Sequence, residues 1–558
     1  MSTNSKHPKA LPYLFFTEMW ERFGYYLMLG LFTLYLQEKY DNGGFELPKN
    51  VAYDVFGTFI ALVFLTPFVG GLIADRKIGY IKSIVFGGIL MGAGYCILAI
   101  HNLNWFYFGL VLIVVGNGFF KPNISTLLGN LYNTPEYKDK KDSGYNIFYM
   151  GINIGALICN FFAAYLRNKY GWGAAFTAAG VGMFIGLIVF FIGIKHCLVG
   201  DIKKDDHLNV KSNSDDEVPL SKIALTIFLP AFVFGFIGWI IPGNIFGSDS
   251  SDAFLFSTLP VIYYYISLYT NAKPSEKRPI AALLVVMLVS VMFWAVFKQN
   301  GTALTTWAKY YTDREAPAAV EPVFTTLKLS EEINTNVGKV DNYDKNFNLI
   351  KIKSGPDSGK TEKVLGKDIY LRNIAPENAP PMDSKIKVIN TEIYQSINPF
   401  WVVALTPLVV VFFMWLKRRN KELSTPSKIA WGLFISALSP LVMVAAVYVC
   451  SNGEIKASSW WLWGTYGVIT VGELFLSPMG LSLVSKLSPP RLTGLMMGGW
   501  FLSTSIGNKL SSILASLWDK YDNKANFFLT NSMLLLTSAI IIFFLLRWLN
   551  QVFKESAK

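Results

Sequence analysis

The sequence predicts an all-α polytopic membrane protein, and three observations lead to this fold class. First, 52% of the 558 residues are hydrophobic and only 16% are charged, which is too apolar for a soluble protein of this length. Second, segments of about 20 apolar residues, enough to cross a bilayer as a helix, recur along the chain. Third, Lys and Arg gather in alternate loops, as they do when a chain crosses a membrane many times.

Fourteen segments are predicted as membrane spans, each bounded by polar or turn-forming residues. They cover residues 12–37, 52–75, 81–100, 104–131, 145–166, 174–196, 221–241, 254–271, 279–310, 395–416, 427–450, 459–486, 491–517 and 526–549. The first six are closely spaced, the next two follow a polar linker, and six more begin at 279. This count predicts the major facilitator fold, with 12 core helices in two six-helix bundles plus two inserted helices.

The predicted domains follow from this count. They are an N-terminal six-helix bundle at 12–196, a linker with two extra spans at 197–278, and a C-terminal six-helix bundle at 279–550, interrupted by 312–395.

The basic loops set the orientation. "DRKIGYIK", "EYKDKKD" and "KRRNKELSTPSK" alternate with "IHNLNW" and "SNGEIKASS", which places both termini in the cytoplasm and the protein in the plasma (inner) membrane as a multi-pass protein. The net charge of +12 therefore does not mark a nucleic-acid surface. The first span is long and charged, so we expect it to be retained and not cleaved as a signal. The four cysteines lie in or beside spans and predict no disulfide framework.

Residues 312–395 are the one long hydrophilic segment, and the orientation places it outside, in the periplasm or extracellular space. Short alternating pieces such as "FNLIKIKS" and "KDIYLRN" lie between turn signals. Two alternatives remain for this insertion, a small β-rich domain, which we favour, and a structureless loop.

The first span carries three charges. Glu18, Glu21, Arg22 and Tyr25 share one helical face. A charge at mid-membrane costs about 2.5 to 3.5 kcal/mol even on the insertion scale, so the cluster must be paired and turned toward a wet interior. The alternative to a relay is a static ion pair between helices.

Three later spans carry lone charges, Lys121 in "GNGFFKPNIS", Lys298 in "MFWAVFKQNG" and Glu473 in "VGELFLSPMG". Each lies near Gly, Pro or Asn, which open or bend membrane helices beside a cavity. Snorkelling toward a helix end is the alternative for either lysine. It is a poor explanation for Glu473, which has a shorter side chain and apolar neighbours on both sides.

Uncharged polar residues accompany these charges. Tyr149 and Asn153 share a helical face, as do Glu473 and Ser477, and Asn398 opens a span. Trp500 lies among glycines, which remove neighbouring bulk, although a lone Trp or Tyr is more often a packing residue.

Several stretches together resemble the proton-coupled oligopeptide transporters of the major facilitator superfamily. In chain order they are "EMWERFGYY", "GGLIADRKIG", "GFFKPNIS", "FYMGINIGA", "FWAVFKQ", "QSINP", "GELFLSP" and "MMGGWFLS". The resemblance runs from residue 12 to about 550 apart from the insertion, and it implies uptake of di- and tripeptides driven by protons.

The resemblance also implies roles for individual residues. Glu18, Glu21 and Arg22 would form the proton-coupling cluster with Lys121, and Lys298 and Glu473 would share in the coupling. The residues implied to bind substrate are Tyr26, Lys121, Tyr149, Asn153, Trp294, Lys298, Asn398, Glu473, Ser477 and Trp500. Of these, Glu473, Asn153 and Asn398 would hold the peptide's amino terminus, and Tyr26, Tyr149, Ser477 and Trp500 would line its backbone and side-chain pockets.

Two positions depart from the family pattern. Leu29 stands where the family commonly has a second arginine for the peptide carboxylate, and Lys298 stands where it usually has Glu or Asp. With Lys509 left out as a residue that can snorkel, the acids and bases inside the membrane are equal in number. Our hypothesis is that Lys298 replaces both roles in part, helping Lys121 hold the carboxylate and acting as a switch.

We expect transport by alternating access of the two bundles around a central site in a functional monomer, and loss of gradient-driven uptake in Glu21→Gln with exchange preserved. A different cargo on the same fold, such as an amino acid, nitrate or a modified peptide, is the alternative, because Leu29 and Lys298 alter the site.

The sequence also limits other functions. The four histidines fall in tails or loops, so carboxylates are expected to carry the coupling; they are His7, His101, His196 and His207. The sequence shows no catalytic pair, metal cluster or cofactor motif, so neither an enzyme nor a cofactor is expected. A receptor whose working part is the insertion is a further alternative.

Overall fold

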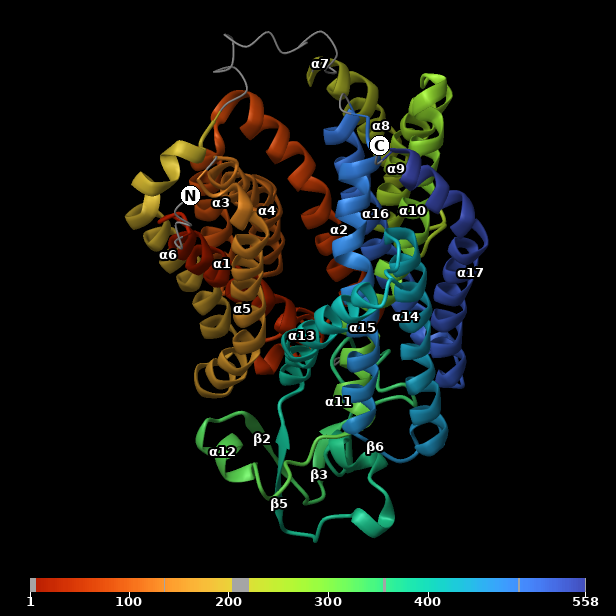
Figure 1. The fold of residues 1–558 in the computed structure, drawn as a ribbon. Helices are drawn as coiled ribbons and strands as arrows, with labels where there is room; N and C mark the ends of the chain where they lie inside the picture. Colours follow the sequence, from red (N-terminus) through yellow and green to blue (C-terminus); the bar gives the residue numbers. More distant parts are fainter. Residues whose placement is uncertain (1–6, 135, 203–219, 355–357, 490–491, 557–558) are drawn as a thin grey trace.

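The structure is a computed structural model that describes most of the chain and is largely helical (Figure 1). The described residues are 7–134, 136–202, 220–354, 358–489 and 492–556. The predicted linker around 203–219, with His207, lies outside them.

The first bundle contains the six helices that the sequence predicts. They are α1 (Leu11–Gln37), α2 (Lys49–Ile73), α3 (Tyr80–Leu98), α4 (Leu103–Tyr132), α5 (Lys141–Tyr170) and α6 (Trp172–Cys197). Their shared core is rich in aromatic residues, and the Phe106 ring centroid lies 5.7 Å from those of both Phe32 and Tyr35. Glycine allows α3 and α4 to touch, since a Cβ on Gly87 would lie 2.5 Å from the Gly116 carbonyl oxygen.

The second bundle repeats this arrangement with one interruption. Its helices are α10 (Pro274–Phe297), α11 (Ala303–Tyr310), α13 (Ile397–Arg418), α14 (Thr425–Val449), α15 (Trp460–Leu487), α16 (Thr493–Ser516) and α17 (Lys524–Ser556).

The predicted span 279–310 is broken between α10 and α11 by the 3₁₀ turn η8 (Lys298–Gly301). The Thr305 side chain satisfies a backbone group at this break by donating to the Asn300 carbonyl (2.6 Å). The Gln299 side chain ties the break to α16 by donating to the Ser511 carbonyl (3.1 Å). A Cβ on Gly301 would clash with Phe56 of α2, so the break also lets the two bundles approach.

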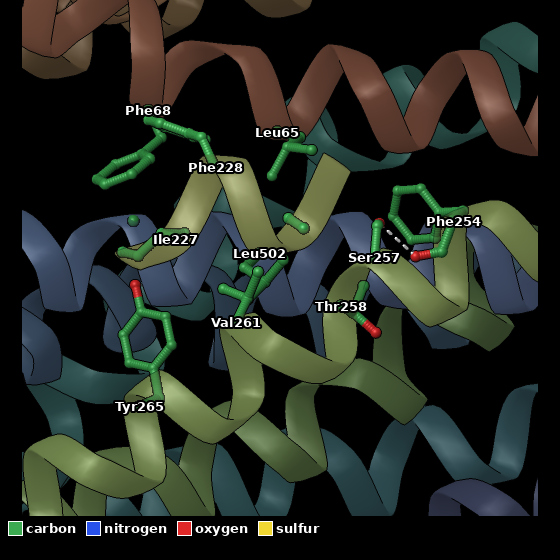
Figure 2. A pocket seen from close by; sticks show the side chains of 12 residues that line it. Leu65, Phe68, Ile227, Phe228, Phe254, Ser257, Thr258, Val261, Tyr265 and Leu502 are labelled. Carbon is green, nitrogen blue, oxygen red and sulfur yellow. Dashed lines mark hydrogen bonds between the residues drawn. The ribbon is translucent and has the colours of Figure 1, made fainter. Parts of the chain in front are cut away.

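Two inserted helical runs join the bundles. The first consists of α7 (Leu220–Ile223), η7 (Ala224–Phe228) and α8 (Leu229–Ile240), and the second is α9 (Asp249–Thr270). We call them the inserted hairpin. It packs beside α2 and α16 and leaves an apolar pocket between these elements, lined in part by Phe68, Phe228, Val261 and Leu502 (Figure 2).

The predicted fold class is confirmed. Each of the fourteen predicted spans falls on a helix or helical run, and in the described part of the chain ten of these are long and apolar enough to cross a bilayer on their own. The four cysteines are free, and Cys159, Cys197 and Cys450 are buried.

The insertion is folded but contains little sheet. Its elements are β1 (Thr312–Asp313), α12 (Glu321–Thr326), β2 (Ser330–Asn334), β3 (Gly338–Asp341), β4 (Lys363–Gly366), η9 (Ile369–Asn373), η10 (Pro376–Asn378), β5 (Lys385–Ile389) and η11 (Thr391–Ser396). Strands β2 and β5 pair antiparallel, as do β3 and β4, while β1 pairs in parallel with β6 (Ala457–Ser458) outside the insertion.

Neither of the two pieces that suggested strands becomes a regular strand. Within "KDIYLRN", η9 begins where the Asp368 side chain accepts from the Tyr370 N–H. "FNLIKIKS" makes only isolated bridges, Tyr343 with Leu349 and Lys351 with Thr361. The alternation was too short to separate strand from turn.

The insertion lies at the end of the molecule opposite both termini (Figure 1). We call the two ends the insertion side and the terminal side.

Candidate functional site

The first-helix cluster is an ion-paired group closed off from solvent. Arg22 donates Nε and Nη2 to the two carboxylate oxygens of Glu21, and its Nε lies 3.5 Å from Glu18 Oε1. The three residues are 0–3% exposed, so the prediction that they face a wet interior is wrong for this conformation. Arg22 is held by these pairs and by Tyr25, whose ring centroid lies 4.8 Å from the Arg22 guanidinium.

One atom of this cluster has no partner. Glu18 Oε2 is buried and accepts no hydrogen bond within the described part of the chain. Arg22 contacts both carboxylate oxygens of Glu21 but only one of Glu18. If a proton binds Glu18 at its second oxygen, that oxygen is no longer a charged acceptor without a hydrogen bond.

Lys121 and Lys298 meet at an aromatic ring that the sequence did not single out. Lys121 Nζ of α4 lies 4.3 Å from the centroid of Phe64 in α2, and Lys298 Nζ at the α10 break lies 5.6 Å from the same centroid. Lys298 also lies 6.0 Å from the Trp294 ring. Phe64 therefore brings a cation from each bundle to one place, where the ring face attracts both.

Neither lysine has an anionic partner. Within the described chain no carboxylate oxygen lies within 4.0 Å of Lys121 Nζ or Lys298 Nζ, and neither nitrogen donates a hydrogen bond. Both side chains are half-buried. The charges of Glu18 and Glu21 act on Lys121, and that of Glu473 acts on Lys298, at longer range.

Glu473 of α15 is joined to α13. The Asn398 side-chain amide donates to Glu473 Oε2 (3.4 Å) and to Thr470 Oγ1 (2.8 Å). Two of the three residues that the resemblance assigns to the peptide's amino terminus are therefore in contact, and this half-buried carboxylate retains acceptor capacity.

Asn153, Tyr149 and Tyr26 lie on the first bundle. The Asn153 amide donates to the Tyr149 carbonyl of its own helix (2.9 Å), and within the described residues it forms no hydrogen bond with Glu473. Tyr149 is 51% exposed although it lies within a membrane helix, and the charge of Glu18 acts on it. Tyr26 is half-buried and packs against the core of the first bundle.

Trp294, Ser477 and Trp500 lie on the second bundle. Trp294 Nε1 and Ser477 Oγ are buried without a hydrogen-bond partner among the described residues. Trp500 is 4% exposed, and its ring packs directly on Gly480, since a Cβ there would lie 2.0 Å from the ring. In this conformation Trp500 is a packing residue between α15 and α16.

Leu29 is half-buried among the apolar residues of the first bundle, one turn from Tyr25 and Tyr26.

Two further residues of the site were not predicted from the sequence. Phe64 stands in an ordinary apolar run. Asn117 of α4 is fully buried and has no partner for either side-chain polar atom in the described chain. Its position four residues before Lys121 was the available signal.

Lys509 corrects the expectation of a snorkelling side chain. It is 0% exposed and donates to Asp54 Oδ1 (2.6 Å) and Thr58 Oγ1 (2.6 Å) of α2. Asp54 also accepts from Ser248 (2.8 Å) and Ser251 (3.0 Å) at the start of α9. This neutral pair ties α16, α2 and the inserted hairpin together, and it leaves the charge balance of the other membrane residues unchanged.

The two bundles are joined on the insertion side. Thr33 donates to the Gly301 carbonyl (2.9 Å), and Asn160 donates to Ser396 (3.1 Å). Arg167 at the end of α5 pairs with the fully buried Glu392 through two hydrogen bonds of 2.7 and 3.3 Å. Toward the terminal side the ribbons of the two bundles diverge (Figure 1).

The insertion spans this joined end. It contacts the first bundle where Asn168 and Asn390 exchange hydrogen bonds (2.9 and 3.1 Å), and Thr361 donates to Glu46 (2.9 Å). It contacts the second bundle where Asn373 donates to the Tyr310 carbonyl (3.0 Å). If the bundles separate at this side, the contacts of the insertion with at least one of them must break.

We expect Glu392→Gln to open the insertion side more often. The variant leaves the Arg167 guanidinium with a neutral partner in a buried place, which costs about 1 to 3 kcal/mol. The readout is labelling by a membrane-impermeant maleimide at Tyr149→Cys, added from the insertion side, and we expect about tenfold faster labelling. Glu555→Gln, which removes the exposed pair with Arg278, is the matched control and should not change the rate. Equal labelling in both variants would show that the Arg167–Glu392 pair does not hold the gate.

The described histidines are not part of this site. His7 contacts the Tyr132 hydroxyl (2.6 Å), His101 contacts the Gly44 carbonyl (2.7 Å), and His196 lies in the last turn of α6.

The apolar pocket of Figure 2 is a separate feature. Its polar lining is limited to hydroxyls, and the Ser257 hydroxyl is already used by the Phe254 carbonyl (2.6 Å). It offers no charge to a zwitterion.

Comparison with known proteins shows which family the chain resembles. The model of the POT family matches residues 81–210 and 377–532. The uncharacterized transporter YclF of Bacillus subtilis is 30% identical over 92% of this chain and 89% of its own. The di-/tripeptide transporter of Lactococcus lactis subsp. lactis is 27% identical over 96% and 94%.

Solved structures agree as well. A glutamate-to-glutamine mutant of the peptide transporter POT in complex with alafosfalin is 26% identical, with a TM-score of 0.71 over 98% of this chain and 96% of the other. A POT family transporter in complex with 5-aminolevulinic acid has a TM-score of 0.71 at 21% identity, over 97% and 96%, and shows the shared fold. The chain therefore belongs to the POT family of membrane transporters.

Proposed function

We propose that this protein imports di- and tripeptides together with protons, by alternating access of its two bundles. The observation that carries the proposal is a set of charged groups without an oppositely charged partner in the described chain: the Lys121 and Lys298 ammonium groups at Phe64, and the Glu473 carboxylate beside Asn398. A peptide supplies the missing partners, a carboxylate for the lysines and an ammonium for Glu473. The related chains named di-/tripeptide transporters support this substrate.

In this proposal Glu473 and Asn398 hold the amino terminus, and Lys121 and Lys298 hold the carboxylate that the missing arginine at Leu29 would otherwise hold. Tyr26, Tyr149, Asn153, Trp294 and Ser477 contact the peptide backbone and side chains. Trp500 joins them only when α15 and α16 separate.

The proton binds at Glu18 in this proposal. Glu18 has a buried oxygen without a partner, whereas both oxygens of Glu21 are engaged by Arg22. Protonation removes the charge that Glu18 exerts on Arg22 and Lys121 and changes which state of the protein is favoured.

The terminal side is the cytoplasmic side in this proposal, as the basic loops predict, and the protein works as a monomer in the plasma membrane. The bundles at 12–196 and 279–550 rock about the central site, while 197–278 and 312–395 are additions to the mechanism. The conformation described here is then closed to the outside by the Arg167–Glu392 pair and its neighbours.

A different cargo is less well supported. The pairing of Glu473 with Asn398 favours a substrate with an amino group and disfavours a simple anion such as nitrate.

Uptake of radiolabelled dialanine into proteoliposomes tests the substrate. We expect accumulation with an inward proton gradient, competition by unlabelled di- and tripeptides, and no competition by nitrate. Competition by nitrate or by single amino acids as strong as that by dipeptides would reject the proposed substrate class.

A further inference from the structure

The half-buried charged residues of the candidate site carry one more positive charge than a simple peptide can match. Lys121 and Lys298 contribute two positive charges and Glu473 one negative charge, and all three side chains are half-buried. Glu18, Glu21 and Arg22 are 0–3% exposed, so they cannot contact a substrate here, and their charges act on Lys121 only at longer range. A dipeptide with neutral side chains brings one ammonium and one carboxylate, so one lysine stays without an anion.

The unmatched charge lies at the carboxyl end of the site. Both ammonium groups lie against the ring of Phe64, so they cannot be farther apart than their two distances to its centroid combined. Glu473 is held on the α13–α15 side by Asn398. A second substrate carboxylate would therefore be recognised when it belongs to the same residue as the first.

A lysine without an anionic partner in a half-buried site costs free energy. Its positive charge is partly desolvated, and the Phe64 ring only partly replaces water. Within the described chain no carboxylate lies close enough to either lysine to form an ion pair. A substrate carboxylate that reaches it gains a charge-assisted interaction without displacing a protein partner.

We propose that this transporter prefers peptides whose carboxyl-terminal residue is acidic, with Lys121 and Lys298 together binding the backbone carboxylate and the side-chain carboxylate of that residue. This preference rests on the proposed peptide transport and specifies the substrate class of the same site. Lys298 is then a specificity-determining residue that contacts the substrate.

Competition against labelled dialanine, with four unlabelled peptides, tests the preference. Ala-Glu carries the second carboxylate at the carboxyl terminus, Ala-Gln is its uncharged match, Glu-Ala has the same composition with the acid at the other end, and Ala-Lys adds a positive charge. We expect half-inhibition by Ala-Glu at a concentration about three- to tenfold below those of Ala-Gln and Glu-Ala, with Ala-Lys the weakest.

Variants locate the preference. Lys298→Gln should make Ala-Glu and Ala-Gln equal competitors, while Lys298→Arg should keep the preference because it keeps the charge. Lys428→Gln, which removes a lysine packed on Phe413 away from this site, is the matched control and should behave like the unmodified protein.

The outcomes separate the two claims. If Ala-Gln competes as well as Ala-Glu in the unmodified protein, the acidic preference is wrong while peptide transport stands. If Ala-Glu is preferred but Lys298→Gln keeps that preference, the assignment to Lys298 is wrong. If none of the four peptides competes, the proposed peptide site itself fails.

Discussion

Glu473→Gln is expected to weaken binding of a dipeptide by about 2 kcal/mol, or roughly thirtyfold, because the variant removes the charged partner of the substrate's amino group. The amide that replaces the carboxylate can still accept a hydrogen bond from Asn398, so the contact between α13 and α15 survives. The measurement is the concentration of dialanine that half-inhibits uptake of a labelled dipeptide in exchange mode, where no proton gradient is needed.

An N-acetylated dipeptide is the control for this variant. It lacks the ammonium group, so it should bind the unmodified protein weakly and should not distinguish it from Glu473→Gln. If both peptides lose the same factor in the variant, Glu473 supports the structure of the site and does not hold the amino terminus.

Glu18→Gln is expected to reduce gradient-driven accumulation of dipeptide to the level reached without a gradient, while exchange of labelled for unlabelled peptide continues. The amide mimics a protonated carboxyl in size and charge, so the variant stays in the protonated form of the cluster. The Glu21–Arg22 pair is untouched, and the fold should therefore be kept.

Glu21→Gln distinguishes a residue that binds the proton from one that stabilises the fold. It leaves the buried Arg22 guanidinium with Glu18, 3.5 Å away, as its remaining anionic partner, and we expect a loss of about 3 kcal/mol in stability along with the loss of coupling. A lowered thermal midpoint in Glu21→Gln but not in Glu18→Gln would support this division. Full gradient-driven accumulation in Glu18→Gln would reject Glu18 as the proton site.

Much of the fold could be predicted because each membrane span is a long run of apolar residues. The bilayer requires each crossing to be helical and apolar, so predicted and observed bounds differ by only a few residues, as for 12–37 and α1 (Leu11–Gln37). The sequence marks residues beside Lys298 that can open a helix, but the exact break at Lys298–Gly301 was not predicted, because it depends on Phe56 and Ser511, which are distant in sequence. The structure of the insertion was harder still to predict, since its paired strands are short.

The candidate site was predicted in part because charges in membrane helices are costly and therefore informative. Glu18, Glu21, Arg22, Lys121, Lys298 and Glu473 all stand out for this reason. Phe64 does not, because a phenylalanine in an apolar helix carries no signal until the two lysines are seen against its ring. Lys509 shows the opposite failure, since its partner Asp54 lies 455 positions away in the chain.

Proton movement driven by peptide alone tests the central claim most directly. Proteoliposomes with equal pH on both sides and a pH-sensitive dye inside receive dialanine outside, at zero membrane potential. If peptide and proton move together, the lumen acidifies only when peptide is added, and Glu18→Gln abolishes the signal while exchange persists. Entry of labelled dialanine without acidification in the unmodified protein would contradict proton-coupled transport and leave this chain a peptide carrier without a proton drive.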